Sequence, residues 1–257
     1  MTTKPIAHPD IAPRHRPAYN GDSETNGKVS LATMTGFLKG VPLFTGLSET
    51  ERDALGRDFV RRLYRPGELI FQQDDPGQVL YLVETGQVRI FVEGENGQET
   101  SVTFCGPGDV FGELAVIDED PRSASAVAVK DTALLTLGRD RFREHLRRSP
   151  QLALNFMRAL SVRVRYNTQQ MTSLTQLDVP ARLARKLLEL AQQYGIVESD
   201  GVRIRLTLTQ TDLASLTGAT RESVNKALGH FKRKGLILTQ QGNITVLDPE
   251  ALRDLAS

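Results

Sequence analysis

The hydrophobic positions along the chain change their period at Pro150. Between residues 63 and 137, short apolar runs such as 79–83 and 88–92 alternate with glycine-containing turn signals, which predicts the strands of a barrel or roll. After Pro150 the apolar positions are separated alternately by four and three residues, which is the spacing of a heptad seam. This seam predicts one long helix that pairs with the same helix of a second copy. Its positions are Ala153, Met157, Leu160, Val164, Asn167, Met171 and Leu174.

The polar and glycine-rich positions predict where order begins and where the long helix ends. Residues 1–34 hold few large apolar side chains, so we expect a disordered tail with order from about Thr35. Ser48, with Glu51 three residues later, forms a capping box that opens a short helix. The sequence Asp178, Val179, Pro180 predicts a hinge after the long helix, because proline disfavours helix in the residue before it and suits a first helical position.

A helix-turn-helix is predicted in the last quarter of the chain. Thr209 caps a first helix, with Asp212 completing a capping box, and Gly218 supplies a tight turn. Thr220 then caps a second helix that runs from Arg221 to about Lys234. One face of this second helix is apolar and the other polar; the apolar positions are Val224, Ala227, Leu228 and Phe231. The apolar runs 235–239 and 244–247, separated by a turn, predict a two-stranded wing.

A second motif, at residues 112–124, combines the groups that bind a cyclic nucleotide. Backbone N–H groups of a short helix that begins near Gly112 can hold a phosphate. Glu113 can accept a hydrogen bond from a ribose hydroxyl, Arg122 can neutralise the phosphate, and Ser123 adds a donor. The sequence also allows a simple tight loop in which Glu113 and Arg122 pair with each other.

Both motifs, in this order, resemble the cyclic AMP receptor protein and fumarate–nitrate regulator (CRP/FNR) family of bacterial transcription regulators, and most closely its cyclic AMP receptor branch. The resemblance covers residues 37–247. It implies an α+β fold with a jelly-roll β-roll, a long dimerisation helix and a winged helix-turn-helix. We therefore expect a tail over residues 1–34, a cyclic-nucleotide-binding β-roll over 35–149, a dimerisation coiled-coil helix over 150–178 and a DNA-binding domain over 179–257.

The resemblance also implies roles for individual residues. The nucleotide-binding residues would be Gly112, Glu113, Leu114, Arg122 and Ser123, with Asn167 and Thr168 of the long helix contacting the adenine. The dimer interface would comprise Met157, Leu160, Val164, Asn167, Met171 and Leu174, and the hinge Asp178, Val179 and Pro180. For Asn167 the sequence leaves open a second role, which is to fix the register of the coiled coil.

On the DNA-binding side, the resemblance assigns base contacts and phosphate contacts to different residues. Arg221, Glu222 and Lys226 would read bases, whereas Thr209, Thr220 and Ser223 would contact phosphates. Lys226 stands where the best-known member of the family has arginine, so it keeps the charge but loses the bidentate geometry.

Composition narrows the class of protein. The 257 residues carry 32 Lys and Arg against 31 Asp and Glu, yet basic residues concentrate in 141–165 and 220–234, which favours contact with phosphate. The single cysteine, Cys105, excludes an internal disulfide and a four-cysteine iron–sulfur cluster, and it is expected to be a buried apolar residue. No signal peptide or membrane span is evident, so we expect a cytoplasmic protein.

The sequence thus predicts a homodimeric regulator that binds pseudo-palindromic double-stranded DNA under allosteric control by cyclic AMP. RNA polymerase is an expected partner by resemblance, and no metal, haem or iron–sulfur cofactor is expected. Two alternatives remain: a regulator of the same fold that is independent of nucleotides or senses another effector, and a cyclic-nucleotide-binding module of a signalling complex. No catalytic triad, metal-ligand spacing or Walker-type loop indicates an enzyme.

Overall fold

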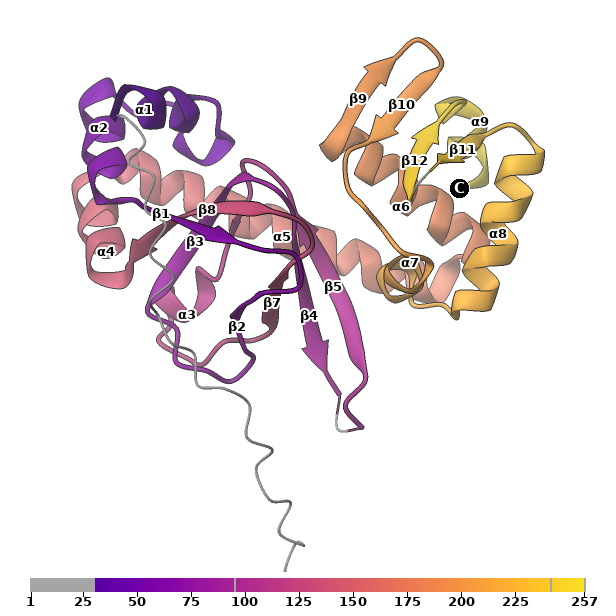
Figure 1. The fold of residues 1–257 in the computed structure, drawn as a ribbon, viewed down its shortest axis with the longest axis horizontal. Helices are drawn as coiled ribbons and strands as arrows, with labels where there is room; N and C mark the ends of the chain where they lie inside the picture. Colours follow the sequence, from indigo (N-terminus) through magenta and orange to yellow (C-terminus); the bar gives the residue numbers. More distant parts are fainter. Residues whose placement is uncertain (1–30, 95, 241, 257) are drawn as a thin grey trace, which may run out of the picture.

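The computed structural model describes residues 31–94, 96–240 and 242–256, which form two domains joined by a long helix (Figure 1). The chain enters through α1 (Leu31–Lys39), the 3-10 turn η1 (Pro42–Phe44) and α2 (Glu49–Asp58). The predicted capping box opens α2, since Glu51 N donates to Ser48 Oγ (3.2 Å) and Ser48 N donates to Glu51 Oε2 (2.7 Å).

Helix α1 begins at Leu31, earlier than the start of order expected at Thr35. Met34 and Leu38, on one side of α1, are buried in the same core cluster as residues of the β-roll, which explains why this stretch is helical. The rest of the predicted tail, residues 1–30, lies outside the described residues.

Two antiparallel sheets make up the β-roll, which confirms the predicted fold. The strands are β1 (Val60–Tyr64), β2 (Leu69–Phe71), β3 (Val79–Thr85), β4 (Val88–Glu93), β5 (Glu99–Cys105), β6 (Val110–Phe111), β7 (Ser125–Ala128) and β8 (Thr132–Gly138), with α3 (Leu114–Ile117) between β6 and β7. The strand orders are β1-β8-β3-β6 and β2-β7-β4-β5. The chain passes between the sheets at Gly86, where φ is +99° and a Cβ would lie 2.5 Å from Thr132 Cα.

Strand β8 is buried on both faces, which accounts for its nearly continuous apolar sequence. Leu134 belongs to the core between the two sheets, together with Ile70 and Val83. Leu135 and Leu137 belong to a second core that helices α1 and α2 and the start of the long helix cover. Strand β8 therefore packs against the other sheet of the roll on one face and against a layer of helices on its other face.

The long helix is α5 (Pro150–Gln176), which follows α4 (Arg139–Arg148). Ser149 caps α5 by accepting a hydrogen bond from Leu152 N, and Asn155 Nδ2 donates to the carbonyls of Leu43 and Thr45 at 2.9 and 2.8 Å. These contacts fix the first turns of α5 to the β-roll, whereas most of its remaining length carries exposed side chains.

The C-terminal domain contains the predicted helix-turn-helix and wing. Its elements are α6 (Val179–Tyr194), β9 (Gly195–Glu198), β10 (Gly201–Ile204), α7 (Gln210–Thr217), α8 (Arg221–Arg233), β11 (Ile237–Gln240), β12 (Asn243–Val246) and α9 (Pro249–Leu255). The four predicted apolar residues of α8 are buried. Strands β9 and β10 were not predicted; they extend the wing to a sheet of order β11-β12-β10-β9.

The two domains also contact each other directly, through α7 and β5 and through several polar side chains. The fully buried amide of Gln87 donates to Thr207 O and accepts from Thr207 N, both at 2.8 Å. Tyr194 donates its hydroxyl to Asp109 Oδ2 (2.7 Å), while burial raises the pKa of that carboxyl. Ser101 Oγ of β5 donates to Asp212 Oδ1 of α7 at 2.9 Å. The helix-turn-helix is therefore attached to the β-roll as well as to α5.

No helix within these described ranges is long and apolar enough to cross a membrane.

Candidate functional site

Arg122 is the centre of the first candidate site. Its guanidinium is buried, and no carboxylate among the described residues forms a hydrogen bond with it. Only 4% of the residue is exposed. Its Nη1 donates to Gly112 O (2.6 Å) and its Nη2 to Val79 O (2.7 Å), while its Nε is buried and has no hydrogen-bond partner. Burial lowers the pKa of Arg122, so the surrounding protein disfavours this cation. A buried cation with a free donor is suited to receive an anion.

Aromatic rings and two glycines make room for this guanidinium. Its Cζ lies 4.3 Å from the centroid of the Phe71 ring and 5.7 Å from that of Tyr81. A Cβ on Gly112 would lie 2.8 Å from Arg122 Nη1, and a Cβ on Gly77 would lie 2.3 Å from the Cβ of Ala115. Among the rings and glycines that surround Arg122, the sequence predicted only Gly112 as a site residue. The others become neighbours of Arg122 only when the sheets fold.

Glu113 contacts the long helix and does not pair with Arg122. Its side chain is 4% exposed and forms an ion pair with Arg163 Nη1 of α5. The loop alternative, in which Glu113 and Arg122 neutralise each other, is therefore wrong. The second carboxylate oxygen of Glu113 retains capacity to accept a hydroxyl hydrogen bond. The Glu113–Arg163 pair links residues 50 positions apart and joins the candidate pocket to α5.

The helix predicted to begin near Gly112 is short, as expected, and starts two residues later. Helix α3 has four residues, begins at Leu114 and follows Glu113 at the N-cap. Gly112 has a φ of +73°, a left-handed conformation that cannot continue a right-handed helix. The N–H groups near Arg122 therefore belong mainly to a loop. Leu114 and Ser123 are exposed beside it.

Two arginines of α4 hold the far end of α3. Arg139 Nη2 donates to Gly77 O (2.6 Å) and Ala115 O (3.0 Å), and Arg143 pairs with Glu119 at 2.7 Å. The hydrogen bond from Arg143 lowers the pKa of Glu119. These contacts fix the loop around Arg122 to α4, directly before the long helix begins.

Asn167 and Thr168 are exposed on α5. Thr168 Oγ1 donates to Val164 O at 3.1 Å, and within the described ranges of this single chain neither side chain bonds to the loop around Arg122. The seam residues around them are also exposed: Met157 by 56%, Val164 by 65%, Met171 by 70% and Leu174 by 53%. An apolar stripe this exposed on one helix is available for another surface.

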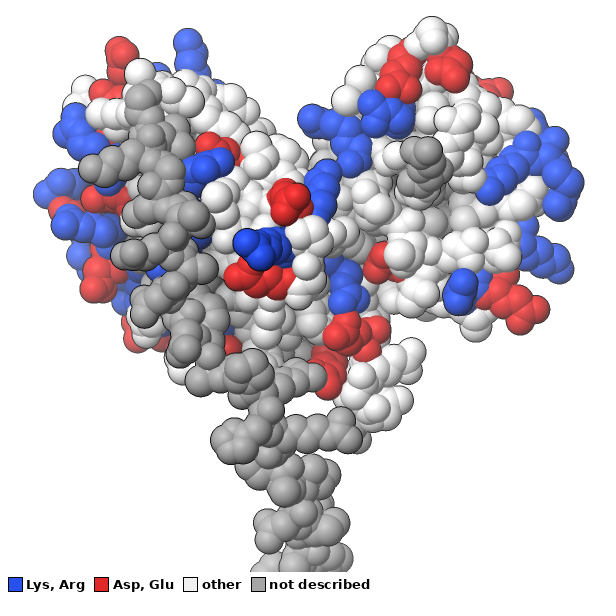
Figure 2. All heavy atoms as spheres, viewed as in Figure 1, with Lys and Arg blue, Asp and Glu red and all other residues white. Residues whose placement is uncertain are grey.

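The second candidate site is the polar face of α8. Gly218 ends α7 with a φ of +57°, and Thr220 Oγ1 accepts from Ser223 N (3.2 Å) to open α8. Arg221, Glu222 and Lys226 are exposed. Figure 2 shows Lys and Arg side chains over the outer edge of this domain, where α8 lies. At the N-terminus of α7, the N-cap residue Thr209 donates from its Oγ1 to Asp212 Oδ2 (2.6 Å) within the predicted capping box.

The predicted hinge lies between the two sites. Asp178 Oδ1 accepts from Ala181 N at 2.9 Å and caps α6, with Val179 and Pro180 in its first turn. Arg182 then donates to Leu177 O (2.6 Å) and to Thr217 O (2.8 Å). The end of α5 and the turn of the helix-turn-helix are thus held by one side chain.

Comparisons with known proteins match the domains that carry the two candidate sites. The family model of the cyclic nucleotide-binding domain matches residues 61–149, and that of the Crp-like helix-turn-helix domain matches residues 181–255. The chain is 38% identical to the cyclic AMP receptor protein of Thermus thermophilus, over 85% of this chain and 98% of that protein. It is 33% identical to the CRP-like cAMP-activated global transcriptional regulator of Mycobacterium tuberculosis, over 82% of this chain and 94% of that protein.

The chain belongs to the CRP/FNR family of transcription regulators. Its membership explains why a cyclic nucleotide-binding domain and a helix-turn-helix domain occur on one chain. The relatives also include the global nitrogen regulator of Synechococcus elongatus, which is 30% identical over 74% of this chain and 86% of that protein. Among the described residues, no group of three or more His, Cys, Asp or Glu could hold a metal ion.

Proposed function

We propose that this CRP/FNR protein is a homodimeric transcription regulator whose affinity for its operator is controlled by cyclic AMP. The observation that carries this proposal is the buried guanidinium of Arg122, which has a free Nε and no carboxylate partner. A cyclic phosphate would supply the missing charge. The names of the Thermus and Mycobacterium relatives support cyclic AMP as the nucleotide.

In this proposal each part of the nucleotide has a partner in the chain. Arg122 neutralises the phosphate, Ser123 and the backbone at Gly112 and Leu114 add contacts, and Glu113 accepts from the ribose 2′-hydroxyl. The adenine lies against Asn167 and Thr168 of the paired long helices. Because Glu113 also contacts Arg163, a ligand held at Glu113 changes the surroundings of α5. The effector acts only through the difference between its affinities for the two conformations of the dimer.

The paired long helices place two recognition helices on one duplex. Two-fold symmetry predicts a pseudo-palindromic operator with half-sites about 34–36 Å apart. Arg221, Glu222 and Lys226 read bases, while Thr209, Thr220 and Ser223 contact phosphates. A regulator of this kind acts in the cytoplasm, with RNA polymerase as its further partner.

The proposal is tested by titrating nucleotide-stripped protein with a labelled pseudo-palindromic duplex, with and without cyclic AMP, at one fixed salt concentration. We expect cyclic AMP to raise the affinity at least tenfold, which corresponds to a coupling free energy of about 1.4 kcal/mol. Tight binding that ignores cyclic AMP would overturn its role as effector. It would favour the alternative of a regulator of the same fold that is independent of nucleotides or senses another effector.

Lys226→Ala is expected to relax base preference at one position of each half-site. Lys226 is exposed on the polar face of α8, and a base contact from lysine contributes about 1–3 kcal/mol of discrimination. The measurement is the affinity for a panel of operators that differ at single base pairs. A uniform loss across the panel, with a smaller dependence on salt, would assign Lys226 to a phosphate contact instead.

A further inference from the structure

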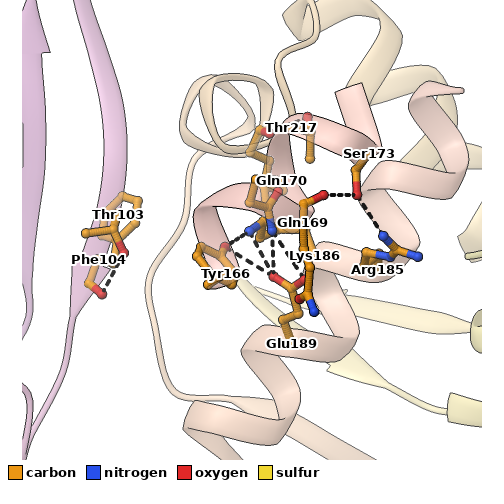
Figure 3. A network of polar contacts seen from close by, with 11 residues as sticks. Thr103, Phe104, Tyr166, Gln169, Gln170, Ser173, Arg185, Lys186, Glu189 and Thr217 are labelled. Carbon is orange, nitrogen blue, oxygen red and sulfur yellow. Dashed lines mark hydrogen bonds and ion pairs between the residues drawn. The ribbon is translucent and has the colours of Figure 1, made fainter. Parts of the chain in front are cut away.

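A polar cluster around a buried lysine crosses the hinge between α5 and α6 and takes no part in either candidate site (Figure 3). We call it the joint cluster; it consists of Tyr166 and Gln170 of α5 and Lys186 and Glu189 of α6. The side chain of Lys186 is only 6% exposed, and its ammonium donates to the hydroxyl of Tyr166 and to Glu189 Oε2 (2.9 Å). Gln170 Nε2 approaches both carboxylate oxygens of Glu189 at 3.3 and 3.4 Å.

The joint cluster is connected so that losing one member affects the others. Tyr166 donates to Glu189 Oε2 at 3.2 Å, and the Lys186 ammonium lies 4.8 Å from the centroid of the Tyr166 ring. Removing a partner of the buried Lys186 ammonium leaves that charge poorly compensated. The resulting loss of stability exceeds the net free energy that the contact itself contributes. A rotation of α6 about the hinge would separate Lys186 from Tyr166, so the cluster resists that rotation.

The joint cluster lies between the proposed adenine contact and the helix-turn-helix. Tyr166 directly precedes Asn167, and one cleft is lined by both of them together with Lys186 and Gly218. At the far side of this cleft, a Cβ on Gly218 would lie 2.6 Å from Leu174 Cδ2, so the end of α5 contacts the turn between α7 and α8. Residues from α5, α6 and the turn of the helix-turn-helix thus meet around one small space.

A second contact from α6 to α5 lies one residue earlier on α6. Arg185 Nη1 donates to Ser173 Oγ (2.7 Å), which in turn donates to Gln169 O (2.9 Å) (Figure 3). This contact involves neutral groups on α5, whereas Lys186 is the buried cation that connects all the charged and phenolic groups of the joint cluster. Loss of Lys186 therefore removes the buried cation of the joint cluster and leaves only the hydrogen bonds of Tyr166 and Gln170 to Glu189 between α6 and this stretch of α5.

We propose that Lys186 is a positioning residue that fixes the orientation of the helix-turn-helix domain relative to α5 and so transmits nucleotide binding to the DNA-binding surface. This inference rests on the proposed function. Nucleotide contacts at Asn167 act on a helix that the joint cluster holds rigidly to α6. Without the joint cluster, α6 loses its contacts with the stretch of α5 beside Asn167, and the orientation of the DNA-binding domain follows that stretch less closely.

The first test is the coupling factor, defined as DNA affinity with saturating cyclic AMP divided by DNA affinity without it. In Lys186→Met, which keeps side-chain length and apolar packing, we expect this factor to fall at least tenfold toward one, while cyclic AMP affinity measured without DNA stays within about threefold of wild type. Tyr166→Phe, which removes only the hydroxyl, should act in the same direction. Because the residues act as a unit, the double variant should lose little more than Lys186→Met alone. Lys130→Met, at an exposed lysine of the β-roll, is the matched control and should keep the full factor.

A second measurement does not depend on nucleotide. Spin labels on Arg158→Cys in α5 and Lys232→Cys in α8 report the distance between the helices, and Cys105 does not interfere because it is buried. With labelled subunits diluted by unlabelled ones, we expect a broader distance distribution in Lys186→Met than in wild type. An unchanged distribution, or a wild-type coupling factor in both Lys186→Met and Tyr166→Phe, would overturn the inference. Absence of coupling in the wild-type protein itself would instead overturn the proposed function.

Discussion

Arg122→Leu is expected to abolish the response to cyclic AMP. The guanidinium is desolvated by the fold, and no carboxylate of the described residues forms a salt bridge with it, so the phosphate would lose the buried counter-charge that Arg122 supplies. Loss of one partner of a buried charged pair costs about 2–5 kcal/mol, which corresponds to a roughly 30- to several-thousand-fold weaker affinity. Isothermal titration with cyclic AMP measures this directly.

A structural role of Arg122 has to be separated from its role in binding, because the guanidinium also donates to the carbonyls of Gly112 and Val79. Thermal unfolding of the nucleotide-free variant reports the structural cost. Added cyclic AMP should raise the melting temperature of wild type and leave that of Arg122→Leu unchanged. Arg122→Lys, which keeps the charge, should fall between them. A normal cyclic AMP shift in Arg122→Leu would remove this pocket from the proposed mechanism.

Features set by local sequence could be predicted. The capping boxes at Ser48 and Thr209 and the left-handed turn at Gly218 depend on residues within four positions of each other, and the structure confirms all of them. The burial of one face of α8 follows from helical period in the same way. Such features depend on hydrogen bonds and side-chain spacing that the chain specifies before it folds.

The contacts that surround Arg122 and Glu113 could not be predicted from the sequence, because they join segments that are far apart along the chain. Arg163 reaches Glu113 across 50 positions, and Phe71 stacks on Arg122 only because β2 and the loop before β7 meet. The late start of α3 depends on the left-handed conformation of Gly112, which the sequence permits without requiring. Strands β9 and β10 are four residues each, and Glu198 and Asp200 surround their turn, so their apolar pattern was too short to recognise.

A substitution in the heptad seam of α5 is expected to have the second large effect, which is a loss of dimerisation. Val164 is 65% exposed in the single chain and lies at the centre of the heptad pattern, so a symmetric dimer would bury it against its own copy. Val164→Glu loses about 1.5–3 kcal/mol of apolar burial per side chain and brings two carboxylates together at the seam. We expect the dissociation constant of the dimer to rise by at least about a hundredfold.

Sedimentation velocity should therefore show a monomer for Val164→Glu at concentrations at which wild type is dimeric. Binding to a pseudo-palindromic operator should fall in parallel, because one recognition helix reaches only one half-site. The chain offers a matched control two residues away: Val162 is 62% exposed but lies outside the heptad positions. Val162→Glu adds the same charge to the same helix and should leave both the dimer and operator binding intact. If the two variants behave alike, the dimer is held by a different surface, and Asn167 and Thr168 of the two copies do not face one nucleotide.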